Sequence, residues 1–331
     1  MKKRKLTKKG NITIVSVIAM LFLAVIVLHE NQFANPHQEL VKKCIAVTII
    51  LVSLFLYAVL YDKIIVLPAE LYQNRRLIWK LAKNDFKTRF AGSYLGIVWA
   101  FVQPVVTILV YWIVFEKGLN AKAEMLADGT EAPYVLWLTA GIVPWFYFSE
   151  ALSNGTTALL EYNYLVKKVV FKISILPIIK IIAATFIHGF FVLFMLLLYM
   201  AHGYFPDAHT LQLFYYSFCL FIFVLGISYT TCAIVIFFRD LTQIIAIVLQ
   251  VGMWATPILW QLSRVPERYQ ILFKLNPMFY IVNGYRSAML EKTWFWEDFY
   301  STMFFWIITA VIFGIGTLIF KRLKVHFADV L

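Results

Sequence analysis

Eight long apolar runs dominate the sequence and set the strongest limit on what this chain can fold into. A segment needs roughly 17–25 mostly apolar residues to cross a hydrocarbon core about 30 Å thick. The runs lie at residues 12–28, 44–61, 94–115, 134–156, 173–200, 211–238, 241–262 and 302–320. Hydrophobic residues make up 62% of the chain and charged residues only 15%, which excludes a soluble globular protein because such proteins are about half apolar and about 25% charged. The sequence therefore predicts an all-α membrane protein with about eight transmembrane helices.

A ninth apolar stretch, residues 269–290, is interrupted by polar and helix-breaking residues that include Lys274, Pro277 and Arg286. Non-helical backbone survives at membrane depth only where protein or a water-filled cavity covers it. We therefore expect a re-entrant or interfacial hairpin here rather than a complete span.

The distribution of basic residues predicts the orientation of these helices. The first run follows six lysine and arginine residues and ends without a small-residue cleavage pattern, so it is read as a retained anchor. With the amino terminus inside, the cytoplasmic segments hold 20 lysine and arginine residues and the outer loops hold 9. Cytoplasmic loops carry this excess in membrane proteins. Both termini are therefore expected on the cytoplasmic side of the cytoplasmic membrane.

Residues 70–91 are too polar to span a bilayer and have the pattern of an amphipathic helix that lies on the cytoplasmic leaflet. At 100° per residue one stripe of this helix is basic, and a further arginine follows it: Arg76, Lys80, Lys83, Lys87 and then Arg89. Two interpretations stay open. The stripe anchors the helix to anionic lipid, at about 1 kcal/mol per basic residue, or it gathers an anionic, lipid-linked substrate at the membrane surface.

The short loop at residues 161–172 is unusually apolar for a cytoplasmic connection. Leu165, Val166, Val169 and Val170 are expected to be exposed there unless something covers them. Exposed apolar patches of this kind mark contact surfaces. We favour a docking site for a soluble partner, with a helix that dips back into lipid as the alternative.

Polar residues inside the runs give few candidates for chemistry. Glu150 lies within the fourth run, and an ionisable residue at that depth is a functional candidate by default. A glutamate that only holds two helices together is an equally good interpretation. His188, His202 and His209 form no convincing ligand set, so no metal site is expected.

Nucleotide-binding and catalytic motifs are missing from the sequence. No G-x-x-x-x-G-K-[ST] loop occurs, so nothing in the chain can cradle nucleotide phosphates in the usual way. No triad-like constellation occurs in a polar loop either. We expect no catalytic site in this chain, no nucleic-acid partner for its net charge of +12, and an energy source in another chain or an ion gradient.

Four stretches carry a resemblance to a known family. They are Asp85–Gly96 followed by Trp99 and Pro104; Ala140–Phe146 leading to Glu150; Tyr164–Phe171 followed by Pro177; and Phe238–Asp240, Thr256–Ile258, Leu275–Met278 and Gly284–Arg286. In this order they resemble the transmembrane subunit of type 2 ABC exporters for lipid-linked polysaccharides. The best match is with the teichoic acid export permeases, on local likeness such as Tyr111–Phe115 and Pro144–Phe146.

The resemblance implies a six-helix exporter core at residues 67–331, preceded by a two-helix extension at residues 1–66 whose role stays open. It makes residues 161–172 the coupling helix and residues 263–295 short extracellular helices that close an outer gate. The residues implied in coupling to the ATPase are Tyr164, Leu165, Val166, Lys167, Lys168, Val169 and Val170, and those implied along the translocation path are Tyr94, Trp99, Trp145, Phe146 and Glu150.

The resemblance also implies partners. Two permeases would pair as a homodimer with two copies of a separate ATPase, which would bind ATP and Mg²⁺. The substrate would be wall teichoic acid on an undecaprenyl diphosphate carrier, with capsule polysaccharide or O-antigen as the alternative polymers.

Two other classes of function remain as alternatives. A membrane glycosyl or phosphoryl transferase would need an acidic or metal-binding cluster at one membrane face, and Glu291, Glu297 and Asp298 are the candidates for it. A purely structural scaffold explains the apolar loop at residues 161–172 poorly.

Overall fold

The structure is a computed structural model that describes residues 2–28, 36–64, 66–89, 94–123, 131–166 and 172–330. Its described residues form helices and connecting segments without any β-strand, so the predicted all-α class is confirmed. The chain divides into two compact units, Met1–Arg75 and Arg76–Leu331. The predicted boundary at residue 66 coincides with the start of α3 (Val66–Thr88), which continues from the first unit into the second.

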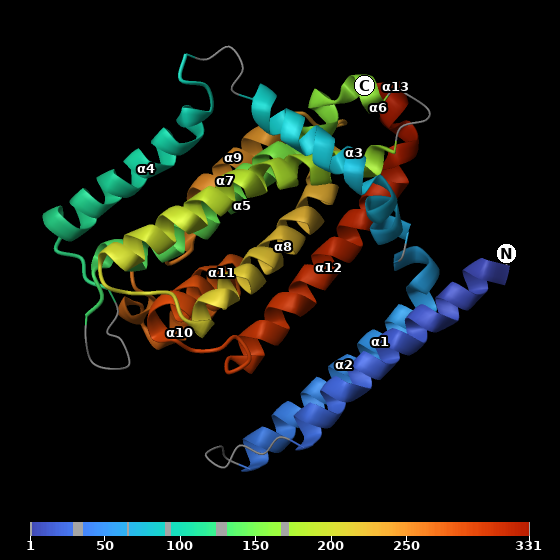
Figure 1. Cartoon of the computed structure of the whole chain (residues 1–331), viewed down its shortest axis with the longest axis horizontal. Helices are drawn as coiled ribbons and strands as arrows, with labels where there is room; N and C mark the ends of the chain where they lie inside the picture. Colours follow the sequence, from blue (N-terminus) through green and yellow to red (C-terminus); the bar gives the residue numbers. More distant parts are fainter. Residues whose placement is uncertain are drawn as a thin grey trace. The chain divides into compact units, whose positions relative to one another are not determined.

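The first unit is a helical hairpin made of α1 (Lys2–Leu28) and α2 (Pro36–Ile64), followed by the first turns of α3 (Figure 1). Polar contacts near both ends of the hairpin show that its helices are antiparallel. The Asn11 amide donates to the Tyr61 hydroxyl at 2.8 Å, and the Lys43 ammonium donates to the carbonyl of Val27 at 3.2 Å.

The second unit is a bundle of long helices with short helices at its two ends (Figure 1). The longer helices are α4 (Trp99–Trp112), α5 (Tyr134–Glu161), α7 (Leu176–Ala201), α8 (Gln212–Val235), α9 (Leu241–Ala255) and α12 (Phe299–Leu323). The short helices are α6 (Asn163–Val166), α10 (Glu267–Lys274), α11 (Pro277–Arg286) and α13 (Phe327–Val330). Two π-helical turns, Ile113–Gly118 and Ser287–Glu291, extend α4 and α11, and 3-10 turns lie at Gly96–Val98, Ile173–Ile175, Ala208–Leu211, Leu262–Arg264 and Lys324–His326.

Helix α5 forms the centre of the bundle, where it packs against α7 and α8 and most of its residues are buried. Small residues allow the helices to approach closely, as is usual where helices pack within a membrane. A Cβ on Gly155 of α5 would collide with the Ser228 side chain of α8, and a Cβ on Gly316 of α12 would collide with the carbonyl oxygen of Gly226 on α8. These glycines therefore set the α5–α8 and α8–α12 spacings.

Six helical segments among the described residues are long and apolar enough to cross a membrane. They are Glu39–Val59, Trp99–Gly118, Tyr134–Glu161, Ile173–Ala201, Ala208–Val235 and Phe299–His326. Two further predicted spans fall short of that length: the apolar part of α1 covers Gly10–Leu21, and α9 ends at Ala255. The chain is thus a multi-pass membrane protein, and the count of eight spans stays a prediction.

The predicted span at residues 241–262 is wrong in its extent, because α9 stops seven residues early and non-helical backbone follows. Thr256, Pro257, Ile258 and Leu259 are all buried. The break is covered by Arg286 of α11, whose guanidinium donates to the carbonyls of Pro257 at 2.7 Å and Ile258 at 2.9 Å. A buried cation therefore satisfies carbonyl groups that a continuous helix would have paired internally.

Arg286 is itself 4% exposed and is held by α5. Its Cζ lies 3.4 Å from the centroid of the Trp137 ring, in a cation–π contact. Gly141 completes the site, because a Cβ there would lie 2.7 Å from an Arg286 guanidinium nitrogen. Arg286, which interrupts the ninth apolar stretch of the sequence, thus connects α11 to α5 and to the backbone that follows α9.

The stretch at residues 269–290 forms the short helices α10 and α11 rather than a span. Asn276 starts α11 by accepting a hydrogen bond from the Met278 amide at 3.0 Å, and Pro277 occupies the first helical turn, where its missing N–H has no cost. The Asn276 amide also donates to the Thr256 hydroxyl at 2.8 Å. The Asn276–Pro277 pair, which argued against a complete span, therefore caps and begins α11.

Candidate functional site

A cluster of charged side chains lies at one end of the bundle, where the last turns of α3 meet the end of α5 and the start of α7. Lys180 is at its centre: its Nζ lies 2.6 Å from a carboxylate oxygen of Asp85 and 2.5 Å from one of Glu161. We call Asp85, Arg89, Glu150, Glu161 and Lys180 the charged cluster. Figure 1 shows α6 at this same end, next to the last turns of α3.

The burial of Lys180 explains why the cluster needs its carboxylates. The residue is 8% exposed, and an unpaired ammonium is costly to bury. The Tyr162 ring adds a cation–π contact at 5.1 Å, and its hydroxyl donates to Asp85 at 2.7 Å. Burial raises the pKa of Tyr162, and the hydrogen bond to Asp85 raises it further. The hydroxyl therefore stays protonated at neutral pH and remains a donor to Asp85.

Arg89 and Glu150 form the second ion pair of the cluster. The guanidinium of Arg89, just after α3, contacts the carboxylate of Glu150 on α5. Of the two interpretations of Glu150, this contact supports the structural one, because it ties α3 to α5. Arg89, which the sequence grouped with the substrate entrance, is exposed, but its guanidinium is paired with Glu150 within the protein.

A polar pocket of about 380 Å³ opens onto the cluster. It is lined by Asp85, Thr88, Arg89, Asn154, Glu161 and Lys180. These side chains hold two cations and two carboxylates, so the formal charge of the lining is balanced. These side chains are suited to hold helices together or to bind an ionic group.

The basic stripe of α3 is displayed as the sequence predicts. Arg76, Lys80, Lys83 and Lys87 are all exposed, and none of them makes a salt bridge within the described part of the chain. The opposite face packs inward: Ile78 and Ala82 are buried. Trp79 and Phe86 make edge contacts with Phe186 of α7, at ring-centroid distances of 5.2 and 5.6 Å. The stripe is therefore available to an anionic surface or ligand.

Lys180 and Asp85 carry no predicted role, although they form the centre of the cluster. The signal for Lys180 was present, since a lysine inside an apolar run needs a partner. Its partners could not be found from sequence because Asp85 precedes it by 95 residues and lies on a different helix.

The coupling segment is described only in part, because Lys167, Lys168, Val169 and Val170 lie outside the described residues. In α6, Tyr164 is 55% exposed and Leu165 is partly exposed. The expectation that Val166 is exposed is wrong, since it is 3% exposed. Successive side chains of a helix point about 100° apart. Val166 therefore packs inward while Tyr164, two residues earlier, faces outward.

The residues predicted along a translocation path lie in different surroundings. Tyr94 and Trp99 are exposed at the start of α4. Trp145 is buried against α9, where a Cβ on Gly252 would lie 3.0 Å from its ring. Phe146 contacts the ring of Phe191 on α7 at 6.2 Å between centroids. Of the five, Glu150 alone joins the charged cluster, and none of them lines the polar pocket.

Comparison with known proteins places these features in a family context. The family profile described as "ABC-2 type transporter" matches residues 76–290, which is well over half of the chain. The match begins at the first residue of the second unit.

Curated relatives align along most of that unit. The O-antigen export system permease protein RfbA of Myxococcus xanthus is 28% identical over 265 residues, covering 80% of this chain and 98% of the relative. A Klebsiella pneumoniae protein of the same name is 23% identical, covering 77% of this chain and 95% of the relative. The polysialic acid transport protein KpsM of Escherichia coli is 24% identical, covering 62% of this chain and 78% of the relative.

Proposed function

This chain belongs to the ABC-2 type transporter family, and we propose that it is the membrane-spanning permease of an ATP-driven exporter of lipid-linked polysaccharide. The observation that carries the proposal is the extent of the likeness: two relatives named as O-antigen export permeases align over at least 95% of their own lengths. The N-terminal hairpin of α1 and α2 precedes the family match, so the exporter core is assigned to the second unit.

The proposed cargo is an anionic or neutral glycan on an undecaprenyl diphosphate carrier. The names of the relatives favour O-antigen or a capsule polymer such as polysialic acid. Wall teichoic acid is the second candidate, on the local likeness of Tyr111–Phe115 and Pro144–Phe146 to teichoic acid permeases. The diphosphate of the proposed carrier is the group that the membrane surface of this chain would meet first.

The exposed stripe of α3 is the proposed entrance for that diphosphate. Four exposed cations on one helix face attract anionic groups at the cytoplasmic leaflet, at about 1 kcal/mol per basic residue. Because Arg89 is paired with Glu150, the proposed entrance consists of the other four basic residues, Arg76, Lys80, Lys83 and Lys87. The positive-inside distribution supports an orientation with this helix and both termini in the cytoplasm.

A separate ATPase is the proposed energy source, docked at residues 161–172. Tyr164 is the described residue that offers an exposed aromatic surface there. The charged cluster lies directly next to this segment, since Glu161 belongs to both and Tyr162 of the segment donates to Asp85 of the cluster. A push on α6 would therefore reach α3 through Asp85 and α7 through Lys180, which is the kind of rigid-body coupling that a two-state transporter requires.

Pairing of two permeases is the last part of the proposal. Apolar side chains of α4, of the π-helical turn that extends it and of α9 are exposed on the single chain, among them Val106, Ile113, Ile247 and Val251. A second copy would cover part of this surface, and Tyr94 and Trp99 would then line a path between the copies.

The test uses the permease co-purified with its ATPase and reconstituted in lipid nanodiscs. We expect ATP hydrolysis to rise on addition of a lipid-linked O-antigen, capsule or teichoic acid polymer, and the polymer with the largest effect identifies the cargo. A complex that hydrolyses ATP at the same rate with and without each of the three polymers would contradict the proposed function. For docking, Tyr164→Asp should reduce ATPase co-purification at least tenfold, while Tyr300→Asp, an exposed tyrosine at the other end of the bundle, should leave it unchanged.

A further inference from the structure

The polar pocket beside the charged cluster lies at the level of lipid headgroups. Its lining residues come from the last turns of α3, the second half of α5 and the start of α7. The candidate span Tyr134–Glu161 has 28 residues, which is about 42 Å of helix and matches the roughly 40–45 Å of a bilayer with its headgroup layers. The end of this span at Glu161 is therefore expected in a headgroup layer, where phospholipid headgroups reach the pocket.

The polar pocket has one buried lining residue and an exposed rim. Lys180 is only 8% exposed, and Asp85 and Asn154 are partly exposed. The exposed lining residues are Thr88, Arg89 and Glu161. The volume of about 380 Å³ lies within the roughly 300–1,000 Å³ of small-molecule sites. The pocket is thus large enough for a small ligand and open to one.

The charged lining residues of the polar pocket have both signs in equal number. Arg89 and Lys180 are cations, and Asp85 and Glu161 are carboxylates. Two carboxylates repel a ligand that is only anionic, and two cations repel a ligand that is only cationic. A zwitterionic ligand avoids both penalties, because its anion pairs with the cations and its cation pairs with the carboxylates.

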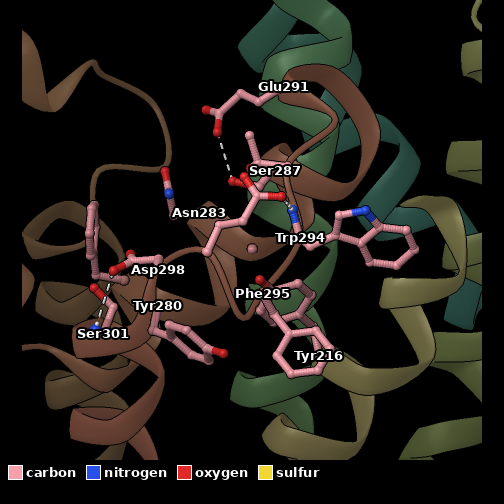
Figure 2. A pocket seen from close by; sticks show the side chains of 13 residues that line it. Tyr216, Tyr280, Asn283, Ser287, Glu291, Trp294, Phe295, Asp298 and Ser301 are labelled. Carbon is pink, nitrogen blue, oxygen red and sulfur yellow. Dashed lines mark hydrogen bonds between the residues drawn. The ribbon is translucent and has the colours of Figure 1, made fainter. Parts of the chain in front are cut away.

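A second pocket, in a different part of the bundle, has a one-sided charge. It has a volume of about 330 Å³ and lies between α11, the loop that follows it and the first turn of α12 (Figure 2). Its charged lining residues are Glu291, Glu297 and Asp298, with no lysine, arginine or histidine among them. It offers no cation to a phosphate group, so it provides a comparison for the polar pocket rather than a site for the same ligand.

Hydrogen-bonding capacity remains in the polar pocket. The Tyr162 hydroxyl and the Lys180 ammonium both contact Oδ1 of Asp85, so Oδ2 has no partner among the described residues. The Lys180 ammonium has three donors and is bonded to two carboxylates. The Asn154 side chain makes no hydrogen bond within the described part of the chain. These groups suit a ligand that has both N–H donors and phosphate oxygens.

We propose that the polar pocket binds a phosphoethanolamine headgroup, the zwitterionic group that phosphatidylethanolamine carries. The ammonium of the headgroup donates to Asp85 and Glu161. The phosphate accepts from Lys180, Arg89 and the Asn154 amide. A headgroup bound in this way contacts α3, α5 and α7 together. Its effect on ATP-driven movement of these helices rests on the proposed function, whereas the binding rests on the pocket alone.

The test measures lipid binding by the full-length chain in detergent, without the ATPase and without nucleotide. Isothermal titration compares short-chain forms of phosphatidylethanolamine, phosphatidylcholine and phosphatidylglycerol. Choline has the same charge as ethanolamine but no N–H donor, and phosphatidylglycerol has no cation. We expect saturable binding of phosphatidylethanolamine and at least tenfold weaker binding of the other two lipids. Absence of saturable phosphatidylethanolamine binding, or equal binding of either other lipid, would overturn the proposal.

The soluble headgroup glycerophosphoethanolamine identifies the source of the ligand. We expect it to bind at least tenfold more weakly than phosphatidylethanolamine, because it lacks the acyl chains that hold a lipid at the protein surface. Equal binding of the two would overturn the lipid as the source and assign the pocket to the free headgroup.

A charge-neutralising variant separates ligand contact from a structural role. Glu161→Gln leaves two cations and one carboxylate in the lining, and its amide oxygen still accepts from Lys180. We expect the ratio of phosphatidylethanolamine to phosphatidylglycerol affinity to fall at least tenfold, because the anionic lipid then meets an excess of cations. Glu297→Gln in the second pocket is the matched control and should leave the ratio unchanged. An unchanged ratio in Glu161→Gln would overturn the assignment to the polar pocket.

A second variant removes a group that has no partner in the described protein. Asn154→Leu should weaken phosphatidylethanolamine binding at least tenfold, whereas Asn84→Leu, on the exposed side of α3 outside the pocket, should not change it. Full affinity in the Asn154 variant would also overturn the assignment. The two proposals fail separately: phosphatidylethanolamine binding without polymer-stimulated ATP hydrolysis removes the exporter function, and stimulated hydrolysis without this binding removes the headgroup site.

Discussion

The ammonium of Lys180 lies 2.6 Å from the carboxylate of Asp85, so a buried residue of α7 holds the end of α3 against the bundle across 95 positions of sequence. The same ammonium also reaches Glu161 at the end of α5. Three helices that surround the proposed docking segment therefore share one cation. Its removal is expected to loosen all three.

Lys180→Met should lower the free energy of unfolding by about 3 kcal/mol, because it leaves the largely buried carboxylate of Asp85 and the half-exposed carboxylate of Glu161 without their cation. Thermal unfolding in detergent measures the change. Lys321→Met removes an exposed lysine from α12 and should stay within about 0.5 kcal/mol of the wild type. Equal stability of the Lys180 and Lys321 variants would show that the cluster does not stabilise the fold.

Charge reversal of the α3 stripe should weaken export without disturbing assembly. Replacing Lys80, Lys83 and Lys87 by glutamate removes about 3 kcal/mol of attraction to anionic groups and keeps good helix-forming residues. We expect at least a hundredfold loss of binding to anionic vesicles and a loss of polymer at the cell surface, with the ATPase still co-purifying. The same reversal of Arg268 and Lys274 on α10 is the control. Normal export by the stripe variant would remove the entrance proposal.

The spacing of α8 and α12 can be tested at two glycines of α12 that lie two residues apart, Gly314 and Gly316. Gly316→Ala should destabilise the protein by about 1–3 kcal/mol, because its Cβ meets the Gly226 backbone and the helices must separate. Gly314→Ala has open space around its Cβ and should be neutral or slightly stabilising, since alanine is the better helix former. The same change in melting temperature for both variants would contradict the close approach of α8 and α12 at Gly316.

Acid should release the contact between Asp207 and Lys292 at the end of the bundle opposite the charged cluster. Partial burial tends to raise the pKa of Asp207, but the hydrogen bond and charge of Lys292 and the amide of Thr210 lower it to about 2. Because the folded value is below the unfolded value of about 3.9, the stabilisation is complete above about pH 4 and is lost as pH falls toward about 2.

Asp207→Asn should therefore remove that part of the pH dependence. The stability difference from the wild type should be at most about 1 kcal/mol at pH 7, because the pair is partly exposed, and it should shrink to zero near pH 2. Chemical unfolding at pH 7, 4 and 2 measures it. A difference that grows on acidification would contradict the assigned direction.

The class of fold and the interfacial helix could be predicted from the sequence because each depends on local pattern. Long apolar runs gave the spans, and a helical repeat of lysines placed the stripe of α3 on the surface. The end of α9 depends on one local signal and one distant partner. Pro257 disfavours helical backbone at Thr256, so the helix ends at Ala255. Arg286, which lies 31 positions beyond Ala255, donates to the carbonyls of Pro257 and Ile258 that the helix leaves unpaired, and this contact could not be predicted from a local pattern.

The candidate site shows the same limit. Local pattern could select single residues: Glu150 as an acid inside an apolar run, Arg89 as a basic residue after the stripe, and Tyr164 as an aromatic residue in a loop. Their relationships depend on tertiary contacts between α3, α5 and α7, which no local pattern encodes. Lys180 was thus missed as the centre of the cluster, and Val166, which was expected to be exposed unless something covered it, is buried.

The early end of α9 has a consequence for the surrounding lipid. Fifteen helical residues rise about 22 Å, which is several ångströms less than a hydrocarbon core of about 30 Å. Wherever acyl chains rather than protein contact α9, the leaflets have to thin or the helix has to sink, at a cost of fractions of a kcal/mol per ångström of mismatch. The stability of α9 in the membrane should therefore depend on bilayer thickness. Membranes with shorter acyl chains should match the length of α9 best.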